Sequence, residues 1–113
     1  SELREMYRLA LDVGLDVLVE VHDEPELEIA FECGAQLIGV NQRDLKTFEV
    51  DRERALRMAA LMGDDVVRVA ESGVADGEDA RALRSVGYHA VLVGETLVRS
   101  SSPGDALRGL LVR

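Results

Sequence analysis

Four stretches of the chain repeat one pattern, in which a segment with helical periodicity ends at a glycine and a short apolar run begins after two linking residues. The glycines are Gly14, Gly34, Gly63 and Gly87, and the runs that follow them read VLVEV, LIGV, VVRVA and AVLVG. Glycine is favoured just past a helix C-terminus because it adopts positive φ without a Cβ penalty. Such apolar, β-branched runs are typical of strands buried on both faces of a parallel sheet. Arg68 interrupts the third run, and we expect it to be partly exposed at the end of a barrel.

Between these runs, hydrophobic residues recur at the three- and four-residue spacing of amphipathic helices. The pattern predicts helices around residues 3–10, 27–31, 55–62, 80–86 and 107–111. Asp51 precedes the third helix as its expected N-cap. The order is therefore one helix followed by four strand–helix units, which implies right-handed crossovers and a parallel sheet.

Four such units are half of the eight that close a (βα)8 barrel, and a complete barrel typically takes about 250 residues. The chain has 113 residues. We therefore expect an α/β fold that is half of a (βα)8 TIM barrel, with four parallel strands and helices on one face only. Residues 1–113 form one domain in this prediction, the C-terminal half-barrel preceded by part of the preceding helix. The alternative is a compact flavodoxin-like sandwich.

Polar residues follow each apolar run. They are Glu20 and His22, Asn41 and Arg43, Glu71 and Ser72, and Gly94 and Glu95. In parallel barrels the carboxyl ends of the strands build the active site. Because side chains alternate along a strand, Glu20 shares a face with Leu18, and Glu71 shares one with Val67 and Val69. Each polar residue alone is equally well explained as a solvated loop residue, but four equivalent positions favour a site at the barrel mouth.

Two turns have the features of a phosphate site. Small residues at Ser72–Gly73 and Gly94–Glu95–Thr96 let backbone N–H groups approach an anion, and a short helix after either turn would add its positive end. Barrels commonly bind phosphate at the loops after strands seven and eight. Ser-Gly and Gly-Glu are also common turn pairs, so the glycines alone are a weak signal.

Composition narrows the classes of function. Hydrophobic residues make up 47% and charged residues 31% of the chain, as in globular proteins. The net charge of −9 disfavours a nucleic-acid partner, and no apolar run approaches the roughly 18 residues of a membrane span. Cys33 is the only cysteine, which fits a reducing cytoplasm. His22 and His89 lack ligand spacing with a cysteine or a second histidine, so no metal site is expected.

Four strings carry a resemblance to a known family: LVEVHDEPEL at 18–27, IGVNQRDLKTFEVD at 38–51, VAESGV at 69–74 and AVLVGETLVRSSSP at 90–103. In order and spacing they resemble the second half of indole-3-glycerol phosphate synthase. The resemblance implies a lyase of tryptophan biosynthesis that decarboxylates and closes the ring of 1-(2-carboxyphenylamino)-1-deoxyribulose 5-phosphate. It implies a phosphorylated small-molecule substrate and neither a metal nor an organic cofactor.

The resemblance also assigns roles to residues. Glu20, Asn41 and Glu71 match catalytic positions, with Glu20 the acid–base candidate on strand five. Arg43 and Ser72 match substrate-binding positions, and Arg43 is expected to face the anthranilate carboxylate. The phosphate turns fall at Ser72, Gly73, Gly94, Glu95 and Thr96. Some relatives carry serine at position 95, so phosphate contact there is expected through backbone N–H groups.

The family's catalytic lysines come from strands that this chain lacks, and Lys46 is its only lysine. We therefore expect the isolated chain to be inactive without a complementing N-terminal half. A different class of function is a non-catalytic half-barrel that binds phosphate or sulfate and pairs with a second copy of itself through its open edges. Another enzyme is a related phosphate-binding barrel such as phosphoribosylanthranilate isomerase, against which the segment from Asn41 to Leu45 argues.

Overall fold

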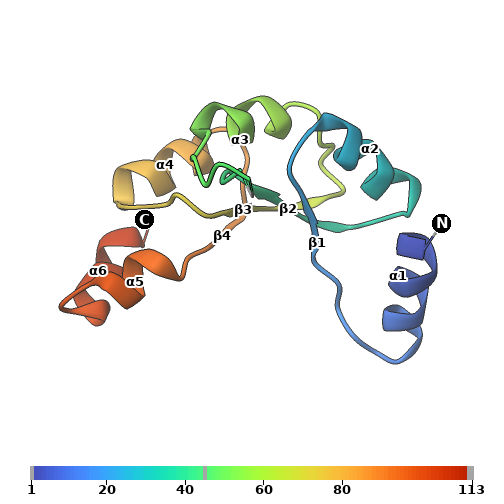
Figure 1. Ribbon diagram of the computed structural model, residues 1–113, viewed down its shortest axis with the longest axis horizontal. Helices are drawn as coiled ribbons and strands as arrows, with labels where there is room; N and C mark the ends of the chain where they lie inside the picture. Colours follow the sequence, from blue (N-terminus) through green and yellow to red (C-terminus); the bar gives the residue numbers. More distant parts are fainter. Residues whose placement is uncertain (1, 45, 112–113) are drawn as a thin grey trace.

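The computed structural model describes residues 2–44 and 46–111, and helices alternate with strands along the described chain (Figure 1). The elements are α1 (Glu2–Asp12), β1 (Val19–Val21), α2 (Glu24–Glu32), β2 (Leu37–Asn41), α3 (Arg52–Ala59), β3 (Val67–Glu71), α4 (Gly77–Ser85), β4 (Ala90–Leu92), α5 (Glu95–Arg99) and α6 (Pro103–Leu110). The strands lie in the order β1-β2-β3-β4, and every pairing is parallel. This is the element order that the sequence predicts, except that two helices, α5 and α6, follow the fourth strand where the pattern predicted one.

The molecule has the shape of an arch. Helices α2, α3 and α4 cover one face of the sheet, while α1 and the α5–α6 pair flank its two ends (Figure 1). The radius of gyration is 14.7 Å, larger than the roughly 13 Å of a compact domain of this length. On the concave face Leu18, Val67 and Leu92 are 39%, 47% and 53% exposed. The fold is therefore a half-barrel, and the sandwich alternative is wrong.

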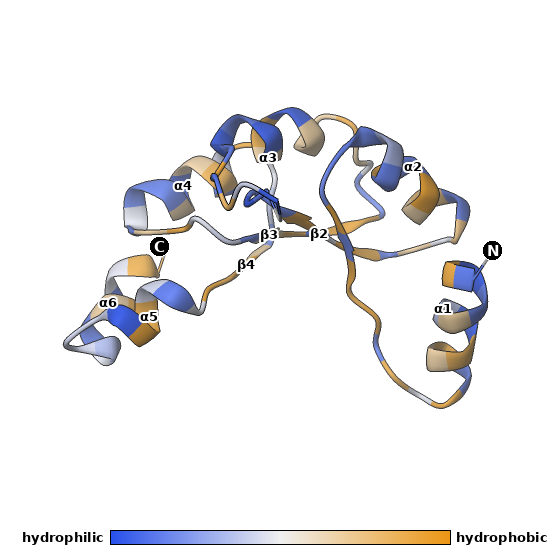
Figure 2. Cartoon of the chain, in the orientation of Figure 1, coloured by the Kyte–Doolittle hydropathy of each residue, from blue (hydrophilic) through white to orange (hydrophobic). Residues whose placement is uncertain are grey.

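The core lies between the sheet and its helices. Val21, Ile38 and Val40 point outward from the strands and are 1%, 0% and 0% exposed. Leu27 of α2 and Met58 of α3 pack into the same buried cluster. The strands are coloured mainly as hydrophobic in Figure 2, as expected for a buried parallel sheet. Burial of each large side chain stabilises the fold by roughly 1.5–3 kcal/mol.

Three aspartates fix where the covering helices begin. Asp23, Asp51 and Asp76 are the N-caps of α2, α3 and α4, and each side chain accepts a hydrogen bond from the backbone N–H three residues later. Such a cap stabilises a helix by about 1 kcal/mol. The predicted cap at Asp51 is confirmed. Each cap sets the residue at which its helix begins. It therefore also sets the length of the loop that joins the preceding strand to that helix.

Arg68 corrects the expectation of partial exposure, since it is only 8% exposed. Its Nη2 donates to the carbonyls of Met62 and Gly63 at 2.9 and 3.1 Å, and its Nη1 donates to that of Gly87 at 3.3 Å. The side chain therefore joins the turn after α3 to the turn after α4. A guanidinium fits this position because its fork of donors satisfies several carbonyls at once.

Helix α1 is amphipathic as predicted, yet little of its apolar side is covered. Tyr7 is buried and its hydroxyl donates to the Gly34 carbonyl at 3.4 Å. Met6 and Leu9 are 66% and 64% exposed. Across the described ranges, none of the helices has the length and apolar character needed to span a membrane.

Candidate active site

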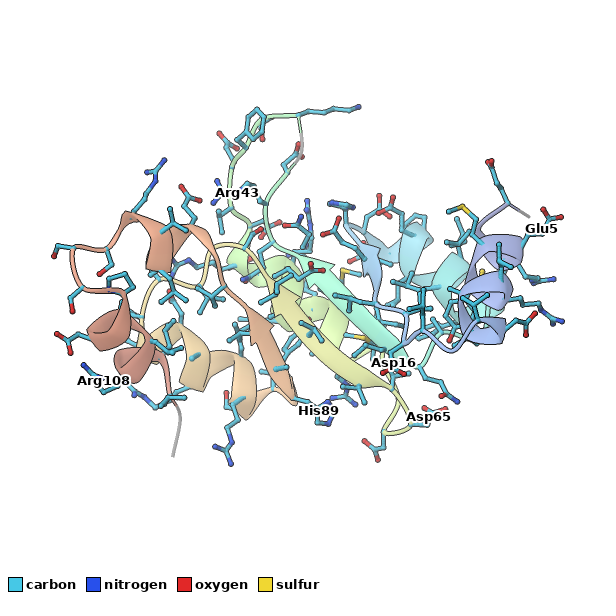
Figure 3. All side chains as sticks on the ribbon, turned by 90° about the horizontal axis from the view of Figure 1, so that it is seen from below. Glu5, Asp16, Arg43, Asp65, His89 and Arg108 are labelled. Carbon is cyan, nitrogen blue, oxygen red and sulfur yellow. The ribbon has the colours of Figure 1, made fainter. Side chains whose placement is uncertain are left out.

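A pocket of about 550 Å³ opens at the carboxyl ends of the strands. Its lining residues are Glu20, Arg43, Arg52, Glu71, Ser72, Gly73, Val74, Ala75, Leu92, Val93, Gly94, Glu95 and Thr96. Figure 3 shows Arg43 at this edge of the sheet, with Asp16, Asp65 and His89 at the opposite edge. Every site residue predicted from the sequence lines this pocket except Asn41, which lies beside it and contacts Glu20.

Glu20 and Glu71 face each other across β2. Glu71 is 5% exposed, and a Cβ at Gly39 would collide with its carboxylate, so glycine at this position makes the room that the carboxylate occupies. Burial, then the charge of Glu20 and a hydrogen bond with it, raises the pKa of Glu71 to about 7, against a smaller opposing effect of His22. Near neutral pH the pair can therefore hold one proton and offer an acid and a base.

Asn41 lies beside this pair rather than on the pocket wall. It is 7% exposed, and its Nδ2 donates to Glu20 Oε1 at 3.4 Å. Its Oδ1 accepts a hydrogen bond from the Arg43 backbone N–H at 2.9 Å. The amide therefore orients Glu20 and fixes the turn from which Arg43 extends.

Arg43 crosses the pocket mouth to the start of α5. Its Nη2 lies 2.8 Å from Glu95 Oε2, and its Nη1 donates to the Phe48 carbonyl at 3.1 Å. Glu95 also pairs with Arg99 at 3.2 Å. The Glu95 carboxylate is thus ion-paired with Arg43. The guanidinium in the pocket therefore already has an anionic partner.

The turn at Ser72 and Gly73 is built by the protein's own packing. Both residues have positive φ, 63° and 70°, and a Cβ at Gly73 would collide with Val50. The next helix, α4, begins only at Gly77 and is capped by Asp76. A helix N-terminus therefore does not lie directly after this turn.

The turn at Gly94 differs, because α5 begins at the next residue and has no side-chain cap bond. The φ of Gly94 is −128°, which other residues adopt, and a Cβ there would meet no atom within 4 Å. Thr96 Oγ1 donates to the Val74 carbonyl at 2.8 Å and ties this turn to the preceding one. The backbone conformation at Gly94 therefore does not require glycine. The missing side chain leaves open space in the pocket.

Sequence reasoning missed three contributors. Gln42 is 2% exposed and its Nε2 donates to the Ser72 carbonyl at 2.7 Å, which holds the β3 turn against β2. A polar residue directly after Asn41 at the end of a buried strand was a signal for it. Arg52 and Leu92 also line the pocket, and Arg52 pairs with Asp79. Arg52 had no such signal, because its position follows from the start of α3.

A parallel half-barrel with its polar pocket at the carboxyl edge defines one half of a (βα)8 barrel of the kind that carries active sites at that edge. The family model for indole-3-glycerol phosphate synthase matches residues 1–110. The chain belongs to the indole-3-glycerol phosphate synthase family, as its sequence motifs predicted.

Curated relatives agree with this assignment. The chain is 50% identical over 98 residues to indole-3-glycerol phosphate synthase 2 of Streptomyces coelicolor, covering 87% of the chain and 38% of that relative. It is 45% identical over 111 residues to the indole-3-glycerol phosphate synthase of Carboxydothermus hydrogenoformans, covering 97% of the chain and 42% of that relative. The chain thus spans about two fifths of the length of these relatives.

Solved structures share the fold at low identity. A FabK mutant from Thermotoga maritima matches with a TM-score of 0.71 and 18% identity, over 87% of this chain and 34% of that one. A native KDPGal structure matches with a TM-score of 0.69 and 21% identity, over 95% of this chain and 50% of that one. At this identity the likeness concerns the arrangement of strands and helices alone.

Proposed function

We propose that this chain forms the C-terminal half of a synthase barrel acting in the cytoplasm. The reaction converts 1-(2-carboxyphenylamino)-1-deoxyribulose 5-phosphate into indole-3-glycerol phosphate, CO2 and water. The observation that carries the proposal is the convergence of Glu20, Arg43, Glu71 and the Gly94 turn on one pocket of about 550 Å³. Membership of the family supplies the reaction class, and the single cysteine fits a reducing compartment.

The charges of the pocket residues suit them to different roles in the reaction. Glu20 is the base, and Glu71 keeps a proton near neutral pH and is the matching acid. Asn41 orients Glu20 through the bond to its Oε1. Arg43 binds the anthranilate carboxylate by its guanidinium fork, which requires Glu95 to release it.

The phosphate end of the substrate is assigned to the turns around Ser72, Gly73, Gly94, Glu95 and Thr96. Support comes from Gly94, where the absent Cβ leaves open space and the start of α5 lacks a side-chain cap. Backbone N–H groups at such a position suit an anion. The Glu95 side chain is held by Arg43 and Arg99 and makes no part of this assignment.

We propose that the 113 residues alone do not turn over the substrate. Lys46 is the only lysine, and it lies on a separate pocket of about 310 Å³ together with His22, Asp23, Glu26, Asp44 and Arg54. Lys46 therefore does not supply a second acid beside Glu71 to the proposed site, and loss of one general acid typically costs roughly 10²–10⁴-fold. The missing walls also leave the substrate poorly positioned and open to water.

Turnover assays test this function directly. We expect purified chain to form no indole-3-glycerol phosphate above background, and a mixture with a chain supplying strands one to four of a relative to restore formation. Glu71→Gln in the mixture should abolish it, while Lys46→Gln should leave it unchanged. Turnover by the chain alone would contradict the proposed division between the halves, and an inactive mixture whose halves demonstrably bind would contradict the function.

The partner of the concave face is the remaining half of the barrel, or a second copy of this chain when it is alone. β1 and β4 are the outer strands of the described sheet, and outer strands are templates for pairing. The apolar side chains of Leu18, Val67 and Leu92 lie on the concave face of this sheet and remain exposed. Covering such a surface is favourable by roughly 25 cal/mol per Å² of apolar area.

A further inference from the structure

His22, directly after β1, lies between two carboxylates. Its Nδ1 is 3.0 Å from Glu26 Oε1 in the first turn of α2, and its backbone N–H donates to the same oxygen at 2.7 Å. Its Nε2 is 3.5 Å from Glu20 Oε2. This Nε2 is buried and has no hydrogen-bond partner among the described residues. The imidazole therefore lies between the first turn of α2 and Glu20. Its Nε2, on the side of Glu20, lacks a hydrogen bond.

The same row continues into the pocket. Beyond Glu20 lies Glu71, whose Oε2 is likewise buried with no hydrogen-bond partner in the described ranges. Glu26, His22, Glu20 and Glu71 are thus successive neighbours from α2 to β3. Each nitrogen of His22 has a carboxylate as its nearest charged neighbour: Glu26 at 3.0 Å from Nδ1 and Glu20 at the ion-pair distance of 3.5 Å from Nε2. A ring with a proton on both nitrogens suits these two neighbours better than a neutral ring, which has one acceptor nitrogen.

We propose that His22 is a positioning residue that holds the Glu20 carboxylate and sets positive charge beside it, so that the proton of the carboxyl pair stays on Glu71. The inference rests on the proposed roles of Glu20 and Glu71. Glu20 is favoured as the anion because its side chain is 43% exposed to water and accepts from Asn41. Glu71 is favoured as the neutral acid because it is 5% exposed.

Other charged groups near these residues leave this balance in place. The pocket that Glu71 lines also contains Arg43, Arg52 and Glu95. Arg43 pairs with Glu95, and Arg52 pairs with Asp79. Those sharing the pocket of His22 are Asp23, Glu26, Asp44, Lys46 and Arg54. Among the causes that shift the pKa of Glu71, only Glu20 and His22 are charged neighbours, and His22 alone opposes the rise. Within the described ranges, no group of three or more His, Cys, Asp or Glu is arranged to hold a metal ion.

A long-range 1H–15N spectrum of the unmodified chain tests the proton count on the ring. At about pH 6.5, near the ordinary midpoint of histidine, we expect both nitrogens of His22 to be protonated in the major form. His89 is an internal control, because its Nδ1 accepts the Arg68 backbone N–H at 3.0 Å and must lack a proton. A His22 ring that is singly protonated while Glu20 is ionised would overturn the proposal.

Carboxyl 13C titration tests the effect on the pair. We expect His22→Gln, which keeps a polar side chain but removes the charge, to raise the midpoint of Glu71 by about half a unit to one unit. His89→Gln, at the other edge of the sheet, should leave that midpoint unchanged. An unchanged midpoint in a folded His22→Gln chain would overturn the inference. If His22→Gln does not fold, the ring spectrum of the unmodified chain still decides the matter. Neither measurement involves turnover, so its outcome is separate from that of the activity assay.

Discussion

Glu71 couples the protonation of the site to the stability of the fold. Its pKa rises from an ordinary value of 4.5 to about 7, mainly by burial and then by the charge of Glu20. A carboxyl group with a raised folded-state pKa binds its proton more tightly in the folded chain than in the unfolded one. Its contribution to stability is therefore complete below about pH 4.5 and is lost as the pH rises through about 7.

Glu71→Gln should remove this loss, because an amide of the same shape stays neutral. We expect the variant and the parent to have similar free energies of unfolding at acidic pH, and the variant to become more stable by up to about 3 kcal/mol above pH 7. Urea unfolding at pH 5 and pH 8 measures the difference. The matched control is Glu28→Gln on the exposed side of α2, which should shift neither value. A constant offset for Glu71→Gln at both pH values would contradict the prediction.

Alternation along the strands was enough to place Glu20 and Glu71 toward the mouth, because a strand fixes the direction of every second side chain. Among the apolar residues that share these faces, Leu18 and Val67 are exposed, whereas Val69 is only 8% exposed. Val69 lies in an inner strand between Gly39 and Ala90, and the side chains of Glu71 and Leu18 extend over Gly39 beside it. Partners distant in sequence, such as Glu95 for Arg43, leave no local pattern to be read.

Among the elements, the two turns at the amino edge of β3 and β4 depend on one side chain. Arg68 donates to three carbonyls in these turns, and its backbone N–H donates to His89 Nδ1. The sequence marked Arg68 as an interruption of an apolar run but did not show its partners, because they belong to the turns after two different helices.

Arg68→Lys should destabilise the chain although it keeps the charge. A single ammonium nitrogen cannot replace the two guanidinium nitrogens that donate to carbonyls on both turns. We expect a loss of about 1.5–3 kcal/mol in the free energy of unfolding. Arg81→Lys on α4, which is exposed in the fold, serves as the control and should change stability by less than about 0.5 kcal/mol. Equal stabilities for the two variants would show that the shared turns do not depend on the fork.

Helix α5 gives the proposed phosphate site a measurable property. We expect inorganic phosphate to shift the backbone amide signals of Gly94, Glu95 and Thr96, with weak affinity because few hydrogen bonds compete with water. Gly94→Val should abolish these shifts while leaving the fold intact, since its Cβ would extend into open space. Gly109→Val on the exposed side of α6 is the control. Shifts that persist in Gly94→Val would place the anion elsewhere.

For the whole molecule, the open arch implies association. A net charge of −9 opposes the approach of two copies, and salt screens that repulsion over about 8–10 Å. We expect sedimentation at micromolar concentration to give a mass above 12.3 kDa, rising with salt. Val67→Glu on the concave face should return the chain to a monomer, whereas Leu61→Glu in the turn after α3 should not. A compact monomer of the parent chain at all salt concentrations would refute the association.

The half-barrel itself could be predicted from the sequence because the same pattern of helix, glycine and strand repeats four times. The limits were in the details of α1, whose apolar side is periodic but is buried only at Tyr7. A periodic pattern shows that a helix has an apolar side and does not show what covers it.

The sheet also has the same order as the chain, so that Val19 pairs with Ile38, Leu37 with Val67 and Val69 with Ala90. During synthesis on the ribosome, each new strand therefore emerges beside a neighbour that is already in place. Pairing between consecutive units keeps loop closure short and favours rapid folding. The arch can grow one unit at a time from its amino end, and covering its concave face is the last step of assembly.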